Sequence, residues 1–191
     1  MDKPFITDQT YTSQDFTGNK LTKAEYENCI FQGCIFSDAY LDNQNFMECE
    51  FIDCNLSNAN IRHTIFKEVS FAHCKMMGLK FEDCNPFLLD FSCTDCNMDY
   101  TSFYGLTLMN QQFVSCKMTE TDFTETVLKN AIFDDCNLQN AIFRQTNLEK
   151  ANFRTAYNFT IDPEHNNLKR AKFSKDTLMG LLGKYDLIIE P

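Results

Sequence analysis

The sequence predicts an all-β solenoid, a chain wound into stacked coils that each have four sides of five residues. Three observations predict this fold. Large apolar residues recur at every fifth position over most of the 191 residues. Small residues, mainly Cys, Ala and Thr, stand two positions before them. Most of the cysteines fall in series spaced by 20, which corresponds to four sides of five residues.

The period of five excludes a regular helix or strand. Five residues advance a helix by about 500°, so the apolar positions would drift around its axis. On a strand, an odd step turns each successive apolar residue to the opposite face. A chain that turns a corner every five residues instead points each large residue inward, from the centre of its own short side.

Residues 1–12 are expected to form an N-terminal extension, and residues 13–156 about seven coils. At about 4.8 Å per layer, these coils make a rod roughly 34 Å long. A first run of central apolar positions extends from Phe16 to Phe81, and a second run from Met98 to Phe153. The second run is offset by two residues, which predicts a small bulge at residues 85–90 beside Pro86.

Stacking of the coils predicts columns of like residues. One column consists of Cys34, Cys54, Cys74, Cys96, Cys116 and Cys136, and another of Phe31, Phe51, Phe71, Phe113, Phe133 and Phe153. Nine of the ten cysteines occupy the small position, and Cys93 occupies a central one. We interpret the cysteines as small buried hydrophobic residues with free thiols.

Residues 157–191 are expected to form a C-terminal segment that caps the rod, joins two copies, or does both. Residues 157–163 are expected to form an exit loop, and residues 171–173 resemble one further side. Ser174 is a candidate N-cap of a short amphipathic helix, and residues 186–190 are expected to form a brief strand. The candidate cap or dimer contacts are Leu178, Met179, Leu181, Leu182, Tyr185, Leu187 and Ile188.

Composition and motifs exclude several classes of function. The net charge of −10 disfavours direct nucleic-acid binding, because phosphates require Lys and Arg. No run of 18 apolar residues is present, so no membrane span is expected. The first residues lack an apolar signal segment, which predicts a cytoplasmic location. No nucleotide-binding, hydrolase or zinc-site spacing occurs, and His63, His73 and His165 are interpreted as solvated, so no enzyme, cofactor or metal is expected.

The four-sided register also assigns charged residues to sides, which we name after Tyr26, Phe31, Phe36 and Leu21. Over residues 13–156, 20 acidic and 11 basic residues leave a charge of −9. The adjacent Tyr26 and Phe31 sides hold −3 and −4 of this excess. Ten of their eleven acidic residues are the candidate partner-binding set: Glu25, Glu27, Glu48, Glu50, Asp53, Glu68, Asp90, Asp95, Asp134 and Asp135.

Several segments share a consensus of Ala or Cys, Asn, a large apolar residue and two polar residues. Examples are residues 54–58 (CNLSN), 136–140 (CNLQN) and 151–155 (ANFRT). About three-quarters of the chain resembles the pentapeptide-repeat proteins, and the resemblance implies a right-handed quadrilateral β-helix.

The overall plan resembles the quinolone-resistance (Qnr-like) group, whose repeat rods carry a C-terminal dimerising segment. Those proteins bind DNA gyrase or topoisomerase IV and protect it from fluoroquinolones. The chain lacks the long loops that project from their rods.

The resemblance and the two acidic sides together predict a non-enzymatic homodimer that mimics DNA and binds DNA gyrase or topoisomerase IV. B-DNA carries about 20 charges over 34 Å, more than twice the density of this rod. The alternative is therefore a structural or adaptor module that docks another cytosolic protein without DNA mimicry. In that case the acidic excess serves solubility.

Overall fold

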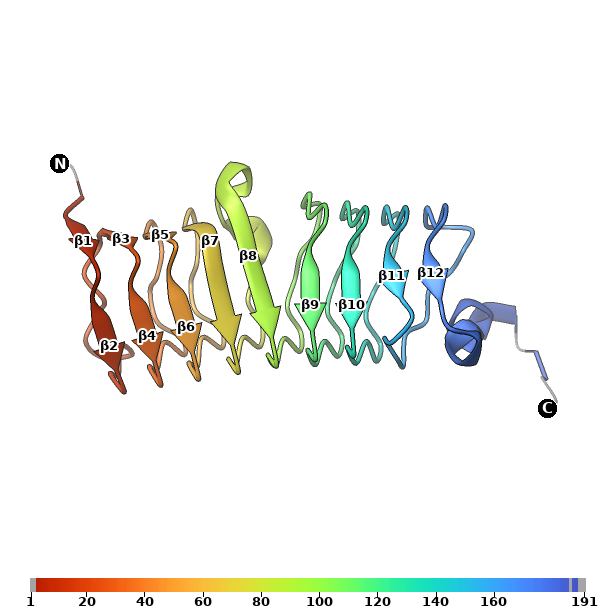
Figure 1. Ribbon diagram of the computed structural model, residues 1–191, viewed down its shortest axis with the longest axis horizontal. Coiled ribbons are helices and arrows are strands. Elements are labelled where there is room, and N and C mark those ends of the chain that lie inside the picture. Colours follow the sequence, from red (N-terminus) through yellow and green to blue (C-terminus); the bar gives the residue numbers. More distant parts are fainter. Residues whose placement is uncertain (1–2, 186, 189–191) are drawn as a thin grey trace.

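The computed structural model is a rod of stacked coils joined by parallel pairing (Figure 1). Each residue pairs with the residue 20 positions later, and only the coil with the bulge departs from this interval. The structure describes residues 3–185 and 187–188. They form a β-solenoid of about eight turns. The predicted class, an all-β, right-handed quadrilateral β-helix, is confirmed, and the right-handed sense is the usual one for connections between parallel strands.

The strands are β1 (Phe5–Thr7), β2 (Thr10–Thr12), β3 (Glu25–Glu27), β4 (Ile30–Gln32), β5 (Asn45–Met47), β6 (Glu50–Ile52), β7 (Ile65–Ala72), β8 (Leu89–Thr94), β9 (Gln112–Val114), β10 (Ile132–Asp134), β11 (Asn152–Phe153) and β12 (Lys172–Phe173). Short 3₁₀ segments are η1 (Phe81–Asp83), η2 (Pro86–Leu88), η3 (Lys175–Leu181) and η4 (Gly183–Tyr185).

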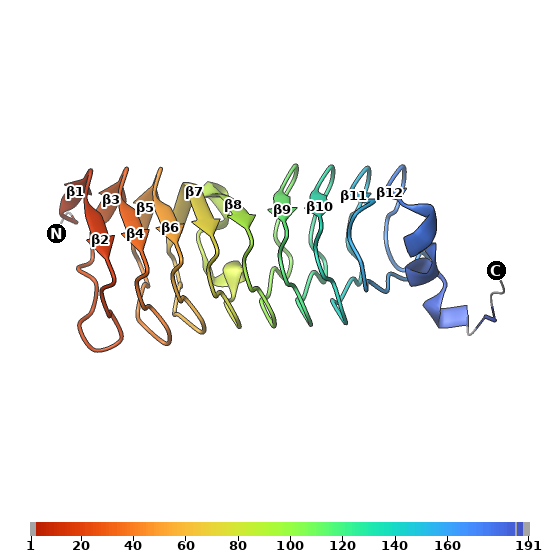
Figure 2. The ribbon, with the colours of Figure 1, turned by 60° about the horizontal axis from the view of Figure 1, so that its bottom comes forward.

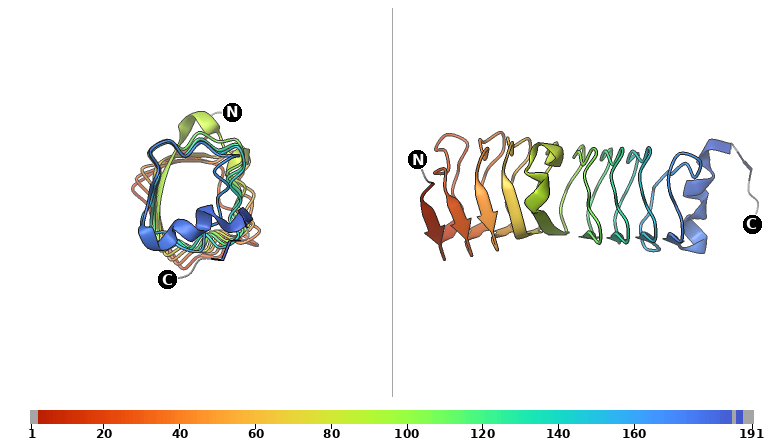
Figure 3. Two further views of the ribbon diagram at one scale, coloured as in Figure 1. Left: turned by 90° about the vertical axis from the view of Figure 1, so that its right-hand side faces the viewer. Right: turned by 90° about the horizontal axis from the view of Figure 1, so that it is seen from above.

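Seen along its axis, the rod is four-sided (Figure 3). Strands cover the Phe31 side along the rod and the Tyr26 side in its first half (Figure 2), whereas the other two sides are joined by isolated bridges.

The solenoid begins earlier than the sequence predicts. Strands β1 and β2 pair with β3 and β4, which places Ile6 beside Tyr26 and Tyr11 beside Phe31. The Tyr11 ring stacks on Phe31 with centroids 4.8 Å apart. The described part of the extension expected at residues 1–12 therefore belongs to the first coil. Its five-residue pattern is hard to detect because Pro4 and Gln9 stand at the position where most later sides have Cys, Ala or Thr.

The core consists of the columns that the spacing predicts. Phe31, Phe51 and Phe71 are buried and stack in consecutive coils, with ring centroids 4.8 and 5.2 Å apart. The cysteines are free and buried, and Sγ of Cys54 donates to the Phe31 carbonyl at 3.2 Å. Burial raises the pKa of the Cys49 thiol to about 12, so this thiol stays protonated at neutral pH. A small hydrogen-bonding side chain at this position thus leaves room for the neighbouring rings.

The two-residue slip is taken up by η2 and by a shift of register between β7 and β8. The coil with the slip has Cys93 at the central position of the phenylalanine column, opposite Phe71. Phe91, at the small position two residues earlier, fills the space instead. Its ring stacks on Phe81 with centroids 4.9 Å apart and lies 6.5 Å from Phe113. The large and small residues have therefore exchanged places in this coil.

The corners need a left-handed backbone. The second residue after each central position has a positive φ in nearly every coil, as at Asp53 (54°), Asn140 (57°) and Gly78 (69°). Asn, Asp and Gly adopt this conformation at lower cost than other residues. Gln145, Lys150 and Arg170 also adopt it, which shows that stacking of the coils imposes the corner.

The coil also continues beyond residue 156, the predicted end of the repeat. Strand β12 pairs with β11 and places Phe173 beside Phe153, as the resemblance of residues 171–173 to a further side indicates. Within the expected exit loop, Phe159 and Ile161 are buried and complete the core. No helix among the described residues has the length and apolar character needed to cross a membrane.

The expected amphipathic helix is two short 3₁₀ segments, η3 and η4, that lie across the C-terminal end of the rod (Figure 3). Ser174 occupies the N-cap position, but its hydroxyl lies 2.9 Å from Oγ1 of Thr177 instead of capping a backbone amide. Leu187 and Ile188 are not in a strand, and the rest of the expected strand at 186–190 lies outside the described residues.

Candidate protein-binding surface

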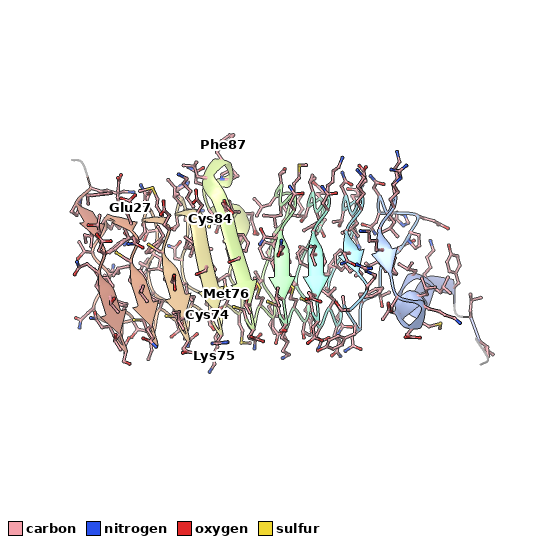
Figure 4. All side chains as sticks on the ribbon, viewed as in Figure 1. Glu27, Cys74, Lys75, Met76, Cys84 and Phe87 are labelled. Carbon is pink, nitrogen blue, oxygen red and sulfur yellow. The ribbon has the colours of Figure 1, made fainter. Side chains whose placement is uncertain are left out.

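The predicted acidic residues of the first coils lie in strands β3 to β8 or directly after one of them. Glu25 and Glu27 lie in β3 and are half-buried. The other eight predicted residues are exposed: Glu48, Glu50, Asp53, Glu68, Asp90, Asp95, Asp134 and Asp135. The strands give this surface regular rows, in which outward side chains repeat every coil (Figure 4).

The corner positions bring some of these groups into direct contact. Glu48 and Glu68 occupy the same left-handed corner in consecutive coils. His73 stands between Asp53 and Asp95 of the coils before and after it, with ring nitrogens 3.4 and 3.7 Å from their carboxylates. His73 is exposed, in agreement with its interpretation as a solvated histidine, but the stacking also places two carboxylates beside it. The partners are 20 and 22 residues away, so only the stacking register identifies them.

Charge on these two sides is unevenly distributed along the rod. Eight of the ten predicted acidic residues lie before residue 96, and no charged residue occurs between Asp99 and Lys117. The last coils carry mostly cations on the same sides: Lys129, Lys150, Arg154, Lys169, Arg170, Lys172 and Lys175. The summed charge of each side does not show this separation, because it combines acidic and basic residues from opposite ends of the rod. The acidic surface is thus the N-terminal half of the Tyr26 and Phe31 sides.

The tail exposes apolar side chains at the C-terminal end. Leu178, Met179, Tyr185, Leu187 and Ile188 are exposed, whereas Leu181 and Leu182 are half-buried. Leu181 packs against the core, so it belongs to the intrachain cap. The seven predicted residues therefore divide into a cap and an outward apolar patch, which we call the tail patch: Leu178, Met179, Tyr185, Leu187 and Ile188.

Polar contacts anchor η4 to the preceding loop. Nζ of Lys184 lies 2.6 Å from Asp162 and 2.7 Å from Glu164, and the Tyr185 hydroxyl donates to Glu164 at 2.9 Å. Lys184 beside Asp162 holds the pKa of that carboxyl below its usual range. The anchor fixes η4, which carries Tyr185 of the tail patch, against this loop.

Metal-ligating side chains are dispersed and thiols are buried in the described part of the chain. None of their His, Cys, Asp and Glu side chains form a group of three or more that could hold a metal ion. A hollow of about 620 Å³ between the last coil and the tail is open to solvent, and Tyr157, Phe159 and Met179 line it. The cysteines are enclosed in the core, and burial raises the pKa of Cys93 well above its ordinary value.

Comparisons with known proteins agree with this architecture. A family model described as "Pentapeptide repeat region" matches residues 44–113, and one described as "Pentapeptide repeats (8 copies)" matches residues 116–154. Together they span more than half of the 191 residues. A sequence search of curated proteins gives no match.

Solved structures share the fold at low sequence identity. A trypsin-treated variant of QnrB1, described as a plasmid-mediated fluoroquinolone resistance protein, is 16% identical, with a TM-score of 0.64 over 96% of this chain and 99% of that one. HetL, a pentapeptide repeat protein involved in heterocyst differentiation regulation from the cyanobacterium Nostoc, is 15% identical. Its TM-score is 0.69, and the match covers 90% of this chain and 87% of HetL. The repeat matches and the shared coil lead to one conclusion: the chain belongs to the pentapeptide-repeat family.

Proposed function

We propose that this protein is a cytoplasmic, non-enzymatic binding rod that mimics duplex DNA, binds DNA gyrase or topoisomerase IV, and protects the enzyme from fluoroquinolones. The observation that carries the proposal is the acidic surface, eight carboxylate residues on two adjacent sides of the first coils. An extended row of negative charge is complementary to a basic groove that otherwise holds DNA phosphates. The similarity in fold to QnrB1 supports the choice of enzyme.

A supercoiling assay tests this function. Gyrase inhibited by a fluoroquinolone is expected to regain supercoiling activity at low concentrations of the protein and to lose it at high concentrations. Supercoiling activity is restored because the rod displaces DNA from the enzyme and so removes the enzyme–DNA complex that the drug targets. Inhibition follows because excess rod competes with the substrate. No effect at any concentration, together with no binding to gyrase or topoisomerase IV at low salt, would refute the proposal.

A matched pair of triple variants tests DNA mimicry itself. Glu48→Gln, Asp53→Asn and Glu68→Gln remove three exposed corner charges from the acidic surface. Three such charges contribute about 1.4 kcal/mol together, so binding is expected to weaken about tenfold. The control variant carries Asp38→Asn, Glu120→Gln and Glu125→Gln, which remove the same charge from corners on the other two sides. Equal weakening by both variants would contradict mimicry by this surface.

An adaptor function is the second candidate, and one observation favours it. Phe87 on η2 is 92% exposed and Leu88 is 43% exposed, so the bulge presents apolar side chains at the surface (Figure 4). Exposed aromatic side chains often anchor protein interfaces. An adaptor that docks through Phe87 is expected to bind its partner equally well when the acidic surface is neutralised.

We also propose that the tail patch joins two copies into a homodimer. Its exposed residues lie beside the cap in sequence, and Lys184 and Tyr185 hold the segment between them to the preceding loop. Met179→Asp combined with Ile188→Asp is expected to convert a dimer into a monomer in sedimentation velocity, because burying two carboxylates in an apolar contact is unfavourable. Ile142→Asp, at an apolar position on the rod with an exposure close to that of Met179 (45% against 50%), serves as the control. A wild-type protein that sediments as a monomer would contradict dimerisation.

A further inference from the structure

The C-terminal end of the rod carries a cationic surface, although the net charge of the whole chain is negative. Its members lie on the Tyr26 and Phe31 sides of the last coils, at and near the corner between them. We call this surface the basic corner, and it consists of Lys150, Lys169, Arg170 and Lys172. The chain as a whole carries −10, which predicts that it does not bind nucleic acid. The fold separates the charges, so this prediction does not hold for each part of the surface.

Stacking holds these cations together. Lys150 and Arg170 occupy the same left-handed corner of consecutive coils, with φ of 61° and 59°. The Lys150 amide donates to the Lys169 carbonyl at 2.9 Å, and Lys172 begins β12 directly after the corner. The backbone of the coil therefore sets the spacing of these side chains at one layer, about 4.8 Å.

The four side chains are exposed and available for a ligand. Within residues 3–185 and 187–188, no carboxylate lies within ion-pair distance of any of them. The nearby Glu149 is paired with Lys129, at 3.2 Å. Lys and Arg side chains have several donors and no acceptor, so an anion with many oxygen atoms satisfies them best.

The acidic surface is too distant to neutralise the basic corner. Asp95 and Arg170 are separated by four layers, about 19 Å, with neutral residues 100–116 between the acidic and basic parts of the chain. This separation exceeds the Debye length of about 8 Å at physiological salt. Asp134 and Asp135 lie closer, but among the described residues neither carboxylate is within ion-pair distance of the four cations, and the Asp134 carboxylate accepts the Thr155 hydroxyl at 2.8 Å instead.

We propose that the basic corner binds the phosphate backbone of duplex DNA. The cations span one layer, about 5 Å, along the axis and at most about 10 Å across it, from Lys169 to Lys172 at about 3.3 Å per residue. A width of about 10 Å corresponds to about three base pairs, so roughly three phosphates are contacted. The contacts reach no base edge, and binding is weak and independent of sequence. In the proposed function, the acidic half occupies the DNA groove of the topoisomerase, and the basic corner holds the duplex that continues from it. Only this last step rests on the proposed function.

The test uses the full-length protein and a fluorescent 20-base-pair duplex, without any topoisomerase. Fluorescence anisotropy between 20 and 150 mM salt is expected to give a slope of log K against log salt of about −3. Lys150→Glu, Lys169→Glu and Arg170→Glu together are expected to abolish this slope and measurable binding. Glu is tolerated at the corner, since Glu48, Glu120 and Glu125 adopt the same backbone.

A control variant changes the net charge equally at exposed cations elsewhere: Arg62→Glu, Lys75→Glu and Lys80→Glu. The proposal requires that this variant retain most of the wild-type affinity and slope. Equal loss in both variants would assign binding to net charge alone. No salt-dependent binding of the wild type, or salt-sensitive self-association in place of DNA binding, would also overturn the proposal. Failure of the protein to bind gyrase would leave this result unaffected, because no enzyme is present in the assay.

Discussion

Replacing Phe113 by Ala is expected to lower the free energy of unfolding by about 3–5 kcal/mol, as large-to-small changes in a close-packed core do. The Phe113 side chain is fully buried. Its ring stacks on Phe133 with centroids 5.3 Å apart and lies 5.8 Å from Phe103. Coils above and below hold the surrounding backbone by parallel pairing, so the cavity has little room to collapse.

Urea unfolding of the wild type and the variant measures this loss. Phe87→Ala is the matched control, because it removes the same side chain from a position that is 92% exposed. It is expected to change stability by less than about 0.5 kcal/mol. A small effect of Phe113→Ala, or equal effects of both substitutions, would mean that the register of the second half is wrong. In a solenoid, the cost also falls on neighbouring coils, so a broadened transition is expected for Phe113→Ala.

Replacing Gly180 by Ala is expected to release the C-terminal cap and to cost about 1–3 kcal/mol, as overpacking does. A Cβ at this position would overlap the Phe159 carbonyl oxygen and lie 2.6 Å from the Phe159 ring. The Gly180 carbonyl also accepts the Ile161 amide at 2.9 Å, so the two segments are held in direct backbone contact. The backbone oxygen cannot move aside without opening the end of the core.

Limited trypsin digestion measures release of the cap, because Lys175 and Lys184 lie in the tail. Cleavage of the Gly180→Ala variant at these residues is expected to be faster than that of the wild type, with a lower urea midpoint. Gly183→Ala is the control in the same tail, since its Cβ would meet only Thr160 Cγ2 at 3.4 Å, an ordinary contact. If the two variants are cleaved at the same rate, close packing of Gly180 is not what holds the cap.

Much of the core was predictable because the repeat is local and strict. The period of five identifies the central residue of each side, and the interval of 20 in the cysteines identifies the number of sides. The first coil was missed, although Ile6 and Tyr11 stand 20 residues before Tyr26 and Phe31. Extending the interval of 20, rather than the pattern of five, would have found them.

The candidate surface was predictable only in part. Assigning acidic residues to sides places them correctly on the Tyr26 and Phe31 sides, but their position along the axis matters equally. Summing over whole sides combined Glu48 with Lys150, which occupy the same corner several layers apart. The contacts of His73 with Asp53 and Asp95 have no signal among its neighbours in sequence, because the three residues belong to different coils.

The sequence by itself determined which residues face inward, how many sides a coil has and where two residues were inserted. It could do so because each side repeats the same short-range packing requirement. Only the tertiary structure decided how the C-terminal end of the solenoid is closed, how Phe91 fills the space beside Cys93, and why position 180 is Gly. It also separated the acidic half from the basic corner. These features depend on contacts between residues of different coils or at an end of the stack, and no periodic signal in the chain encodes such contacts.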